Sequence, residues 1–419
     1  MQRLIPVFLI LFCVSAFRAG AQHYHMLLSR EGEVPVIDMI NLNGENVYDV
    51  ARFRESYLNY PCAVLTGVKA GEILATYIKT DSVRSIEMAR SPDGGRTWNA
   101  EAFRNRWDGE TFRSLSMFHL GQPYIAPGTH RTRKARRSTL GKNNLMLFSG
   151  GSPILVSSSY TNGEQWCNFY PANNFGGFRI SGLVRLRDGR HMALLHDDGR
   201  FLYPDDGHPV ELRKSAIYKI YSSDGGLTWS APEIALKHNV HGLYDAVVVY
   251  SPSKNDSDLI LIASERETSA AYISFSSDNS ASWSYPEKLP SFIQGDRFGI
   301  ATIGRNLIIA FRDMGRTLRD GSPNPTFGDL VLWTGDLREL VRGNRLGFKV
   351  RVADNYPTGG PADYNDRKYY DCGYISVLPI ARNEVAIIAY GRWETEELPF
   401  IRNYTVHPVN IRQYLNEQP

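Results

Sequence analysis

The stretches SPDGGRTW at residues 91–98 and SSDGGLTW at residues 222–229 share the pattern Ser-x-Asp-x-Gly-x-Thr-Trp. Two degenerate copies are SYTNGEQW at residues 159–166 and SSDNSASW at residues 276–283. A short Asp side chain can accept backbone N–H bonds at a tight turn, Gly supplies a positive φ, and Trp buries a large ring against the next strand. The repeat therefore predicts a recurring structural turn rather than a set of catalytic residues.

Short alternating or apolar segments precede each copy of this turn. Those before the turn at residues 222–229 lie at 180–186, 191–195 and 216–221, and they have the length and composition of β-strands. Helical periodicity is nearly absent. Repeated units of about sixty residues with three or four strands each are typical of the blades of a β-propeller.

Two further units lack the turn but keep the same rhythm. Their expected strands are residues 298–303, 306–311, 329–333 and 348–352, then residues 374–379, 384–390, 401–406 and 410–414. First strands are thus expected near Cys62, Pro123, Ile180, Ala246, Phe298 and Tyr374. The sequence predicts an all-β, six-bladed propeller of four-stranded antiparallel blades over residues 58–419. Residues 22–57 are expected to close the last blade, because an unpaired sheet edge is a liability; a seventh blade would arise if they formed one themselves.

The first 21 residues have the pattern of a secretory signal peptide. Arg3 is followed by an apolar run at residues 4–17 and by Ala19-Gly20-Ala21, a small-x-small cleavage pattern. We therefore expect a secreted or periplasmic protein. No later apolar run approaches the roughly 18 residues that span a bilayer, so no membrane insertion is expected.

Composition and charge exclude several classes of protein. Hydrophobic residues make up 42% of the chain and charged residues 22%, which is typical of a soluble globular protein. The net charge of +3 predicts no nucleic-acid partner. No CxxC, HExxH or clustered His/Cys spacing is present, so no metal and no cofactor are expected. Whether Cys62 and Cys372 pair stays open.

Charged and aromatic residues gather at one end of the expected blades. The start of a first strand and the end of a second strand lie at the same end of an antiparallel hairpin, so such residues from all blades meet at one mouth of the central channel. Arg binds carboxylates bidentately and paired acids perform glycosyl chemistry, so this mouth suits an acidic sugar or oligosaccharide. Taken singly, each residue could also be a solvated strand end. The substrate-binding candidates are Arg179, His196, Asp198, Arg266, Arg297 and Arg312.

The repeated turns, on a secreted six-unit propeller, resemble the Asp-box (BNR) repeats of the sialidase superfamily over roughly residues 57–414. The resemblance implies an exo-glycosidase in which an arginine triad holds the substrate carboxylate and a Tyr paired with an acid attacks the anomeric carbon. By similarity to the nucleophile strand, GYISVL at residues 373–378 makes Tyr374 the candidate nucleophile. Asp245 occupies the place of the acid that activates it, and Asp81 the place of the acid/base. Arg266 and Arg297 are similar to two of the triad arginines.

The chain departs from that family at the first blade. Where sialidases have Arg-Ile-Pro it has LNYP at residues 58–61, and the comparable string FRIS at residues 178–181 falls in the third blade. Either Arg54 or Arg179 substitutes for the missing arginine, or the ligand is not sialic acid.

Two other functions remain open. A uronate-directed lyase or glycosidase on the same scaffold would use His196 and Tyr374 for proton transfer. A glycan-binding propeller without turnover is the other alternative, because fold does not imply function.

Overall fold

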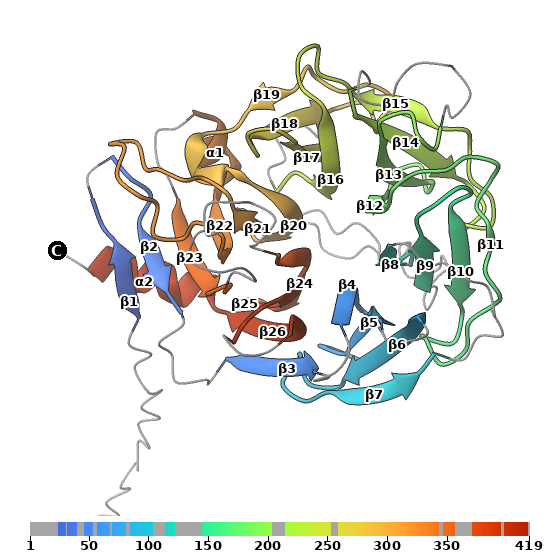
Figure 1. Ribbon diagram of the computed structural model, residues 1–419, viewed down its shortest axis with the longest axis horizontal. Coiled ribbons are helices and arrows are strands. Elements are labelled where there is room, and N and C mark those ends of the chain that lie inside the picture. Colours follow the sequence, from blue (N-terminus) through green and yellow to red (C-terminus); the bar gives the residue numbers. More distant parts are fainter. Residues whose placement is uncertain are drawn as a thin grey trace, which may run out of the picture.

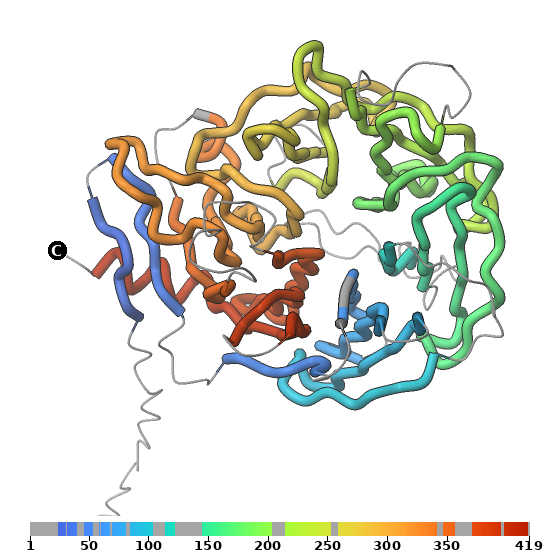
Figure 2. Tube along the Cα trace, in the orientation of Figure 1, coloured from blue at the N-terminus to red at the C-terminus, as the bar shows by residue number. Residues whose placement is uncertain are grey.

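A computed structural model of the protein describes residues 24–30, 32–39, 46–52, 57–67, 69–80, 84–103, 114–121, 145–202, 214–252, 259–342, 347–356, 371–394 and 398–417. Six antiparallel blades surround a central axis, which confirms the predicted six-bladed propeller (Figure 1). The chain runs once around the ring, so the first and last blades are neighbours (Figure 2). The innermost strands β4, β8, β12, β16, β20 and β24 face the axis.

The first three blades have four strands each, in the sheet orders β4-β5-β6-β7, β8-β9-β10-β11 and β12-β13-β14-β15. Their strands are β4 (Tyr57–Leu65), β5 (Ile73–Thr80), β6 (Arg84–Ser91), β7 (Asn99–Ala102), β8 (Leu115–His119), β9 (Leu145–Ser149), β10 (Leu155–Ser159), β11 (Tyr170–Pro171), β12 (Ile180–Arg185), β13 (His191–Asp197), β14 (Ala216–Ser222) and β15 (Glu233–Leu236).

The last three blades follow the same plan, with additions from the N-terminal part of the chain. Their strands are β16 (Leu243–Tyr250), β17 (Leu259–Glu265), β18 (Ala271–Ser276), β19 (Glu287–Lys288), β20 (Gly295–Ile303), β21 (Asn306–Asp313), β22 (Leu330–Asp336), β23 (Phe348–Ala353), β24 (Gly373–Ala381), β25 (Glu384–Gly391) and β26 (Phe400–Val406). A 3-10 helix η3 (Ser291–Ile293) precedes β20, and the α-helices are α1 (Leu337–Arg342) and α2 (Pro408–Glu417).

The N-terminal residues join two different blades. Strand β3 (Val47–Ala51) pairs with β26 and supplies the outer strand of the sixth blade. The hairpin of β1 (His25–Leu28) and β2 (Val36–Asp38) extends the fifth blade, because β2 runs parallel to β23. Among the described residues, no helix is both long and apolar enough to cross a membrane.

Two strand predictions are wrong. Residues 410–414 lie in helix α2: Pro408 starts the helix, and Ile411, Tyr414 and Leu415 have the helical spacing that packs one face on the core. The edge that this segment was expected to fill is occupied by β3. The first strand of the second blade is β8, eight residues before Pro123, which lies outside the described residues.

Each blade packs on the next through its own apolar cluster. Six clusters of buried side chains occupy the six interfaces between neighbouring blades. The cluster between the last and first blades contains Tyr77 of β5 and Ile388 of β25, so the ring is closed by the same apolar packing as elsewhere. Burial of this kind contributes roughly 1.5–3 kcal/mol for each large aliphatic or aromatic side chain.

The repeated turns join the third and fourth strands of the first four blades. In the first, Ser91 Oγ accepts the N–H of Gly95 at 2.7 Å and Asp93 accepts the N–H of Thr97 at 2.9 Å. Trp98 Nε1 then donates to the Gly95 carbonyl at 2.8 Å. The turn at residues 222–229 repeats these bonds at 2.8, 3.0 and 3.1 Å. The same residue types are therefore repeated because they make the same hydrogen bonds in each blade.

These turns also contact the preceding blade. Asn403 of the sixth blade donates to the carbonyl of Gly95 at 3.0 Å, and a Cβ at Gly95 would lie 2.2 Å from Asn403 Nδ2. Lys219 of the third blade donates to the carbonyls of Ser280 and Ala281 in the fourth-blade turn at 2.9 and 2.7 Å. The turns therefore stabilise the ring as well as the individual blade.

Candidate functional site

Five of the innermost strands shift register near their start, at the same mouth of the channel. In four of them a non-glycine residue at the shift has a positive φ between 49° and 57°. Such a conformation costs of order 1–3 kcal/mol per residue and is typical of functional sites, and a bulge also redirects the side chain. The four residues are Tyr60, Asp245, Arg297 and Tyr374.

Three side chains pack around the ring of Tyr374. The Tyr60 ring lies with its centroid 4.7 Å away, and the guanidinium carbons of Arg179 and Arg297 lie 4.7 and 4.8 Å from the ring centroid. Burial raises the pKa of Tyr374 to about 12, although the two arginines oppose this shift. The phenol is therefore neutral at pH 7 and needs a base if its oxygen is to attack.

Arg297 is held in place by an acid. Its Nη1 donates to Asp371 Oδ1 at 2.7 Å and to the Cys372 carbonyl at 3.1 Å, and Tyr390 donates to the other carboxylate oxygen. Burial would raise the pKa of Asp371, but Arg297 and the Tyr390 hydrogen bond outweigh it and lower that pKa. Asp371 is therefore an anion that fixes Arg297 beside the Tyr374 ring.

Arg179 has no such partner among the described residues. Its Nε is buried without a hydrogen-bond acceptor there, and the guanidinium lies over the Tyr374 ring instead. A buried donor without an acceptor is costly in a folded protein, even though the Arg179 side chain as a whole is only partly buried. It points to an anionic group from outside this part of the chain.

Asp245 and His196 meet at the same mouth. His196 Nδ1 lies 3.8 Å from the Asp245 carboxylate, and the Asp245 carboxylate contributes to raising the pKa of Tyr374. Burial lowers the pKa of His196; Asp245 opposes this shift and Arg179 adds to it. The mouth thus combines a neutral phenol, a carboxylate, a neutral imidazole and two guanidinium groups.

The other predicted site residues lie elsewhere. Arg312 is 5% exposed and its guanidinium is paired with Asp296 at 2.7 and 2.8 Å, so it is already neutralised. Asp198 pairs with Arg200 at 2.9 Å, and Arg266 is exposed on the turn after β17. Asp81 and Arg54 lie outside the described residues.

From the sequence, Tyr60 and Asp371 are expected at the mouth because each lies at or just before the start of a first strand, but neither they nor Tyr390 receive an individual role. Asp371 precedes Tyr374 by three residues, just before β24 begins, and the sequence does not show that it pairs with Arg297. Nothing local in the sequence predicts that Tyr60 packs against Tyr374, because the two strands come from opposite ends of the chain and meet only where the ring closes.

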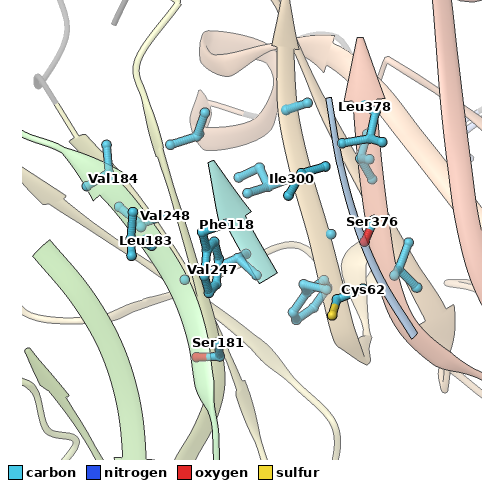
Figure 3. Close-up of a pocket in the computed structure, with 18 of the residues that line it drawn as sticks. Cys62, Phe118, Ser181, Leu183, Val184, Val247, Val248, Ile300, Ser376 and Leu378 are labelled. Carbon is cyan, nitrogen blue, oxygen red and sulfur yellow. The ribbon is translucent and has the colours of Figure 1, made fainter. Parts of the chain in front are cut away.

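A cavity of about 440 Å³ lies along the innermost strands of all six blades. Arg179, Asp245 and Arg297 line it, together with many apolar side chains. Figure 3 shows several of them, including Phe118, Leu183, Val247, Ile300 and Leu378. Cys62 belongs to the same lining, and both it and Cys372 are buried free thiols, not a disulfide.

One group in the described part of the chain has metal-ligand chemistry. Potential ligand atoms of His241, Glu265 and Glu267 lie within 4.8 Å of one another. The Glu265 oxygens, however, already accept the N–H groups of Glu267 and Thr268 and the Thr268 hydroxyl. Glu265 therefore serves as the hydrogen-bond acceptor for the turn that follows β17.

Comparison of the sequence with protein-family models gives no match, and comparison with curated proteins gives none. Solved structures do resemble the fold. A protein of unknown function from Dyadobacter fermentans DSM 18053 has a TM-score of 0.61 at 12% identity, covering 87% of this chain and 98% of its own. The Hadza microbial sialidase Hz136 has a TM-score of 0.53 at 14% identity, covering 86% and 68%.

The NanB sialidase from Streptococcus pneumoniae is similar to the same extent, with a TM-score of 0.51 at 10% identity, covering 87% of this chain and 70% of its own. The protein has the six-bladed propeller fold of sialidases. Identities this low concern the fold alone, so the chemistry rests on the residues at the mouth.

Proposed function

We propose that the protein is a secreted or periplasmic glycoside hydrolase that removes a terminal acidic sugar, sialic acid or a related one, from glycans with retention of configuration. The observation that carries this proposal is the pair of guanidinium groups of Arg179 and Arg297 over the Tyr374 ring, with Arg179 lacking an acceptor among the described residues. Two arginines beside one reacting group suit a substrate carboxylate.

In the proposed reaction Tyr374 is the nucleophile. Its oxygen forms a bond to the anomeric carbon while its proton passes to the Asp245 carboxylate, and the glycosidic C–O bond breaks. The leaving oxygen takes a proton from Asp81 as general acid. Water then attacks the anomeric carbon, Asp81 accepts a proton from it, and Tyr374 leaves with its proton restored.

A phenol suits this task better than a carboxylate. A carboxylate nucleophile would be repelled by the carboxylate of the substrate, whereas the Tyr374 phenol is neutral until Asp245 takes its proton. Arg179, in the third blade, replaces the arginine that the first blade lacks. In the first blade, Tyr60 lies at the mouth instead of that arginine. The substrate carboxylate is thus held by cations of the third and fifth blades.

The neutral imidazole of His196 favours a second candidate, a lyase acting on uronate-containing polysaccharides. His196 or Tyr374 would then remove a proton next to the uronate carboxylate, and elimination would leave an unsaturated sugar. The product distinguishes the two reactions, because hydrolysis adds water and elimination does not.

The test is a substrate screen with product analysis. The protein is incubated with a fluorogenic sialoside, with other acidic glycosides, and with uronate oligosaccharides followed by ultraviolet absorbance. We expect release of a hydrated acidic sugar. An unsaturated uronate would establish the lyase instead, and absence of turnover together with saturable glycan binding would establish a binding protein.

A further inference from the structure

His196 is not a solvated strand end. It is the next-to-last residue of strand β13, and its ring stacks on Phe178 at a centroid distance of 5.1 Å and meets the Tyr244 ring edge-on at 6.1 Å. Its side chain is 13% exposed. The two aromatic contacts fix the ring plane, so the direction of its nitrogens is set by the fold.

The Nδ1 atom of His196 faces the backbone of Asp245. It lies 3.4 Å from the Asp245 backbone nitrogen, whose N–H donates to it. An imidazole nitrogen that accepts cannot carry the proton, so in the neutral ring the proton belongs on Nε2. Burial is the main reason that the pKa of His196 is lowered from 6.5; Asp245 opposes this shift and Arg179 adds to it, and the net lowering favours the neutral form at pH 7.

Asp245 needs support at this point. It has a φ of 49° in the bulge of β16, and a bulge leaves a residue out of the regular strand pairing. Within the described ranges, its carboxylate accepts no hydrogen bond, and the ionic contact that it makes there is with His196 Nδ1 at 3.8 Å. The carboxylate is therefore free to act as a base as long as His196 is neutral.

The remaining charged groups around His196 are already engaged or repel a proton. Asp197 accepts the N–H groups of Gly199, Phe201 and Leu202, and Asp198 pairs with Arg200. Arg179 is a cation and disfavours imidazolium. A protonated His196 would consequently find its partner in Asp245.

We infer that His196 is a positioning residue for Asp245, active only as the neutral imidazole. In that form Nδ1 holds the Asp245 backbone N–H in the bulge and leaves the carboxylate free. Once Nδ1 is protonated it can no longer accept, so the backbone contact is lost and the new N–H pairs with the carboxylate. The kinetic part of this inference rests on the proposed function, whereas the structural part does not.

Two substitutions separate these effects. His196→Asn places an amide oxygen near the position of Nδ1 and cannot titrate; His196→Phe keeps the ring stack but has no acceptor. Kinetically, we expect kcat/KM of the wild type to fall tenfold per pH unit below the pKa of His196, and this limb to be absent in His196→Asn, with a loss of a few fold at pH 7. In His196→Phe we expect kcat to fall roughly 10- to 100-fold with KM nearly unchanged, as for a misplaced catalytic group.

The matched control is His191, at the other end of the same strand. It is also buried, with a lowered pKa, and its Nε2 lies 2.9 Å from the Leu120 carbonyl, far from the mouth end of β13. His191→Gln should leave both the pH limb and kcat unchanged. If the acid limb persists in His196→Asn, or disappears in His191→Gln, the inference is wrong.

A second measurement needs no substrate. In the full chain labelled with ¹⁵N-aspartate, the Asp245 amide resonance, assigned from an Asp245→Glu variant, should shift as the His196 ring titrates and should stay constant in His196→Asn. An Asp245 amide that ignores the titration of His196 overturns the inference, whatever the protein hydrolyses. A shifting amide in a protein that turns over no acidic glycoside would leave the inference standing and refute the proposed function.

Discussion

The turns on the outer side of the blades and the bulges at the channel mouth are both repeats, but they repeat different things. The turns at residues 91–98 and 222–229 repeat residue types, and with them the same hydrogen bonds. The bulges repeat a backbone conformation while their residues are unlike: two tyrosines, an aspartate and an arginine. Recurring side chains therefore indicate scaffold in this ring, and a recurring backbone with differing side chains indicates the candidate site.

Strain follows this division where the turns are intact. Their glycines adopt a positive φ without cost, whereas residues with a Cβ are held in that region at the mouth (Tyr60, Asp245, Arg297 and Tyr374) and in the degenerate turns (Asn162, Asn279 and Ser280). The ring can maintain these conformations because six apolar interfaces and the turns hold the blades together. Substitutions at the mouth should therefore lower activity and leave stability nearly unchanged, whereas substitutions in the turns should lower stability and leave the activity of the folded protein nearly unchanged.

The largest effect is expected from Tyr374→Phe. It removes one hydroxyl from the mouth, so turnover should fall by about 10³-fold or more, while the melting temperature and the affinity for an acidic sugar stay nearly unchanged. Steady-state kinetics, thermal unfolding and calorimetric binding measure the three quantities. Activity within a few fold of the wild type would exclude Tyr374 as the nucleophile.

The opposite result is expected from Trp229→Ala in a turn. Trp229 is 3% exposed and packs edge-on against Phe148 of the second blade, so its truncation should lower the free energy of unfolding by roughly 3–5 kcal/mol. Activity per folded molecule should be preserved. Trp98 is only partly buried, so Trp98→Ala should cost less. A stable but inactive Trp229 variant would contradict the division between scaffold and site.

Lysine substitutions at the mouth should have an intermediate effect. Arg179→Lys and Arg297→Lys keep the charge but lose the planar fork, and each should weaken catalysis on an acidic substrate by roughly 1.5–3 kcal/mol. Catalysis on a substrate whose carboxylate is amidated should be weakened far less by either substitution. The measured quantity is the ratio of kcat/KM for acid and amide. Arg312→Lys is the matched control, because Arg312 is engaged by Asp296 and its replacement should leave that ratio unchanged.

The sequence predicts the fold better than the site because each depends on different distances along the chain. Strands β12, β13 and β14 were predicted to within two residues, since alternation and the following turn are local signals. Strand ends correctly placed Arg179, Asp245, Arg297 and Tyr374 at one mouth. They did not reveal which arginines pair with an acid of the adjacent strand. Asp296 of β20 and Arg312 of β21 are register partners, and that register is known only once the bulge in β20 is located.

The smallest effect is expected from repairing the degenerate fourth turn. Ser280 stands where the intact turns have Gly, at a φ of 73°, and Trp283 Nε1 has no hydrogen-bond partner among the described residues. Ser280→Gly removes the strained Cβ and keeps the backbone carbonyl that accepts from Lys219 and Tyr221. We therefore expect it to raise the free energy of unfolding by about 1 kcal/mol.

The reciprocal change, Gly226→Ser, would place a Cβ 2.3 Å from Met146 and should destabilise the protein. Denaturant unfolding of both variants measures the pair, and activity should remain at the wild-type level in each, since neither residue touches the mouth. Should Ser280→Gly destabilise the chain instead, the Ser280 hydroxyl bond to Tyr221 at 3.1 Å would outweigh the strain, and the fourth turn would be an adapted element rather than a weakened copy.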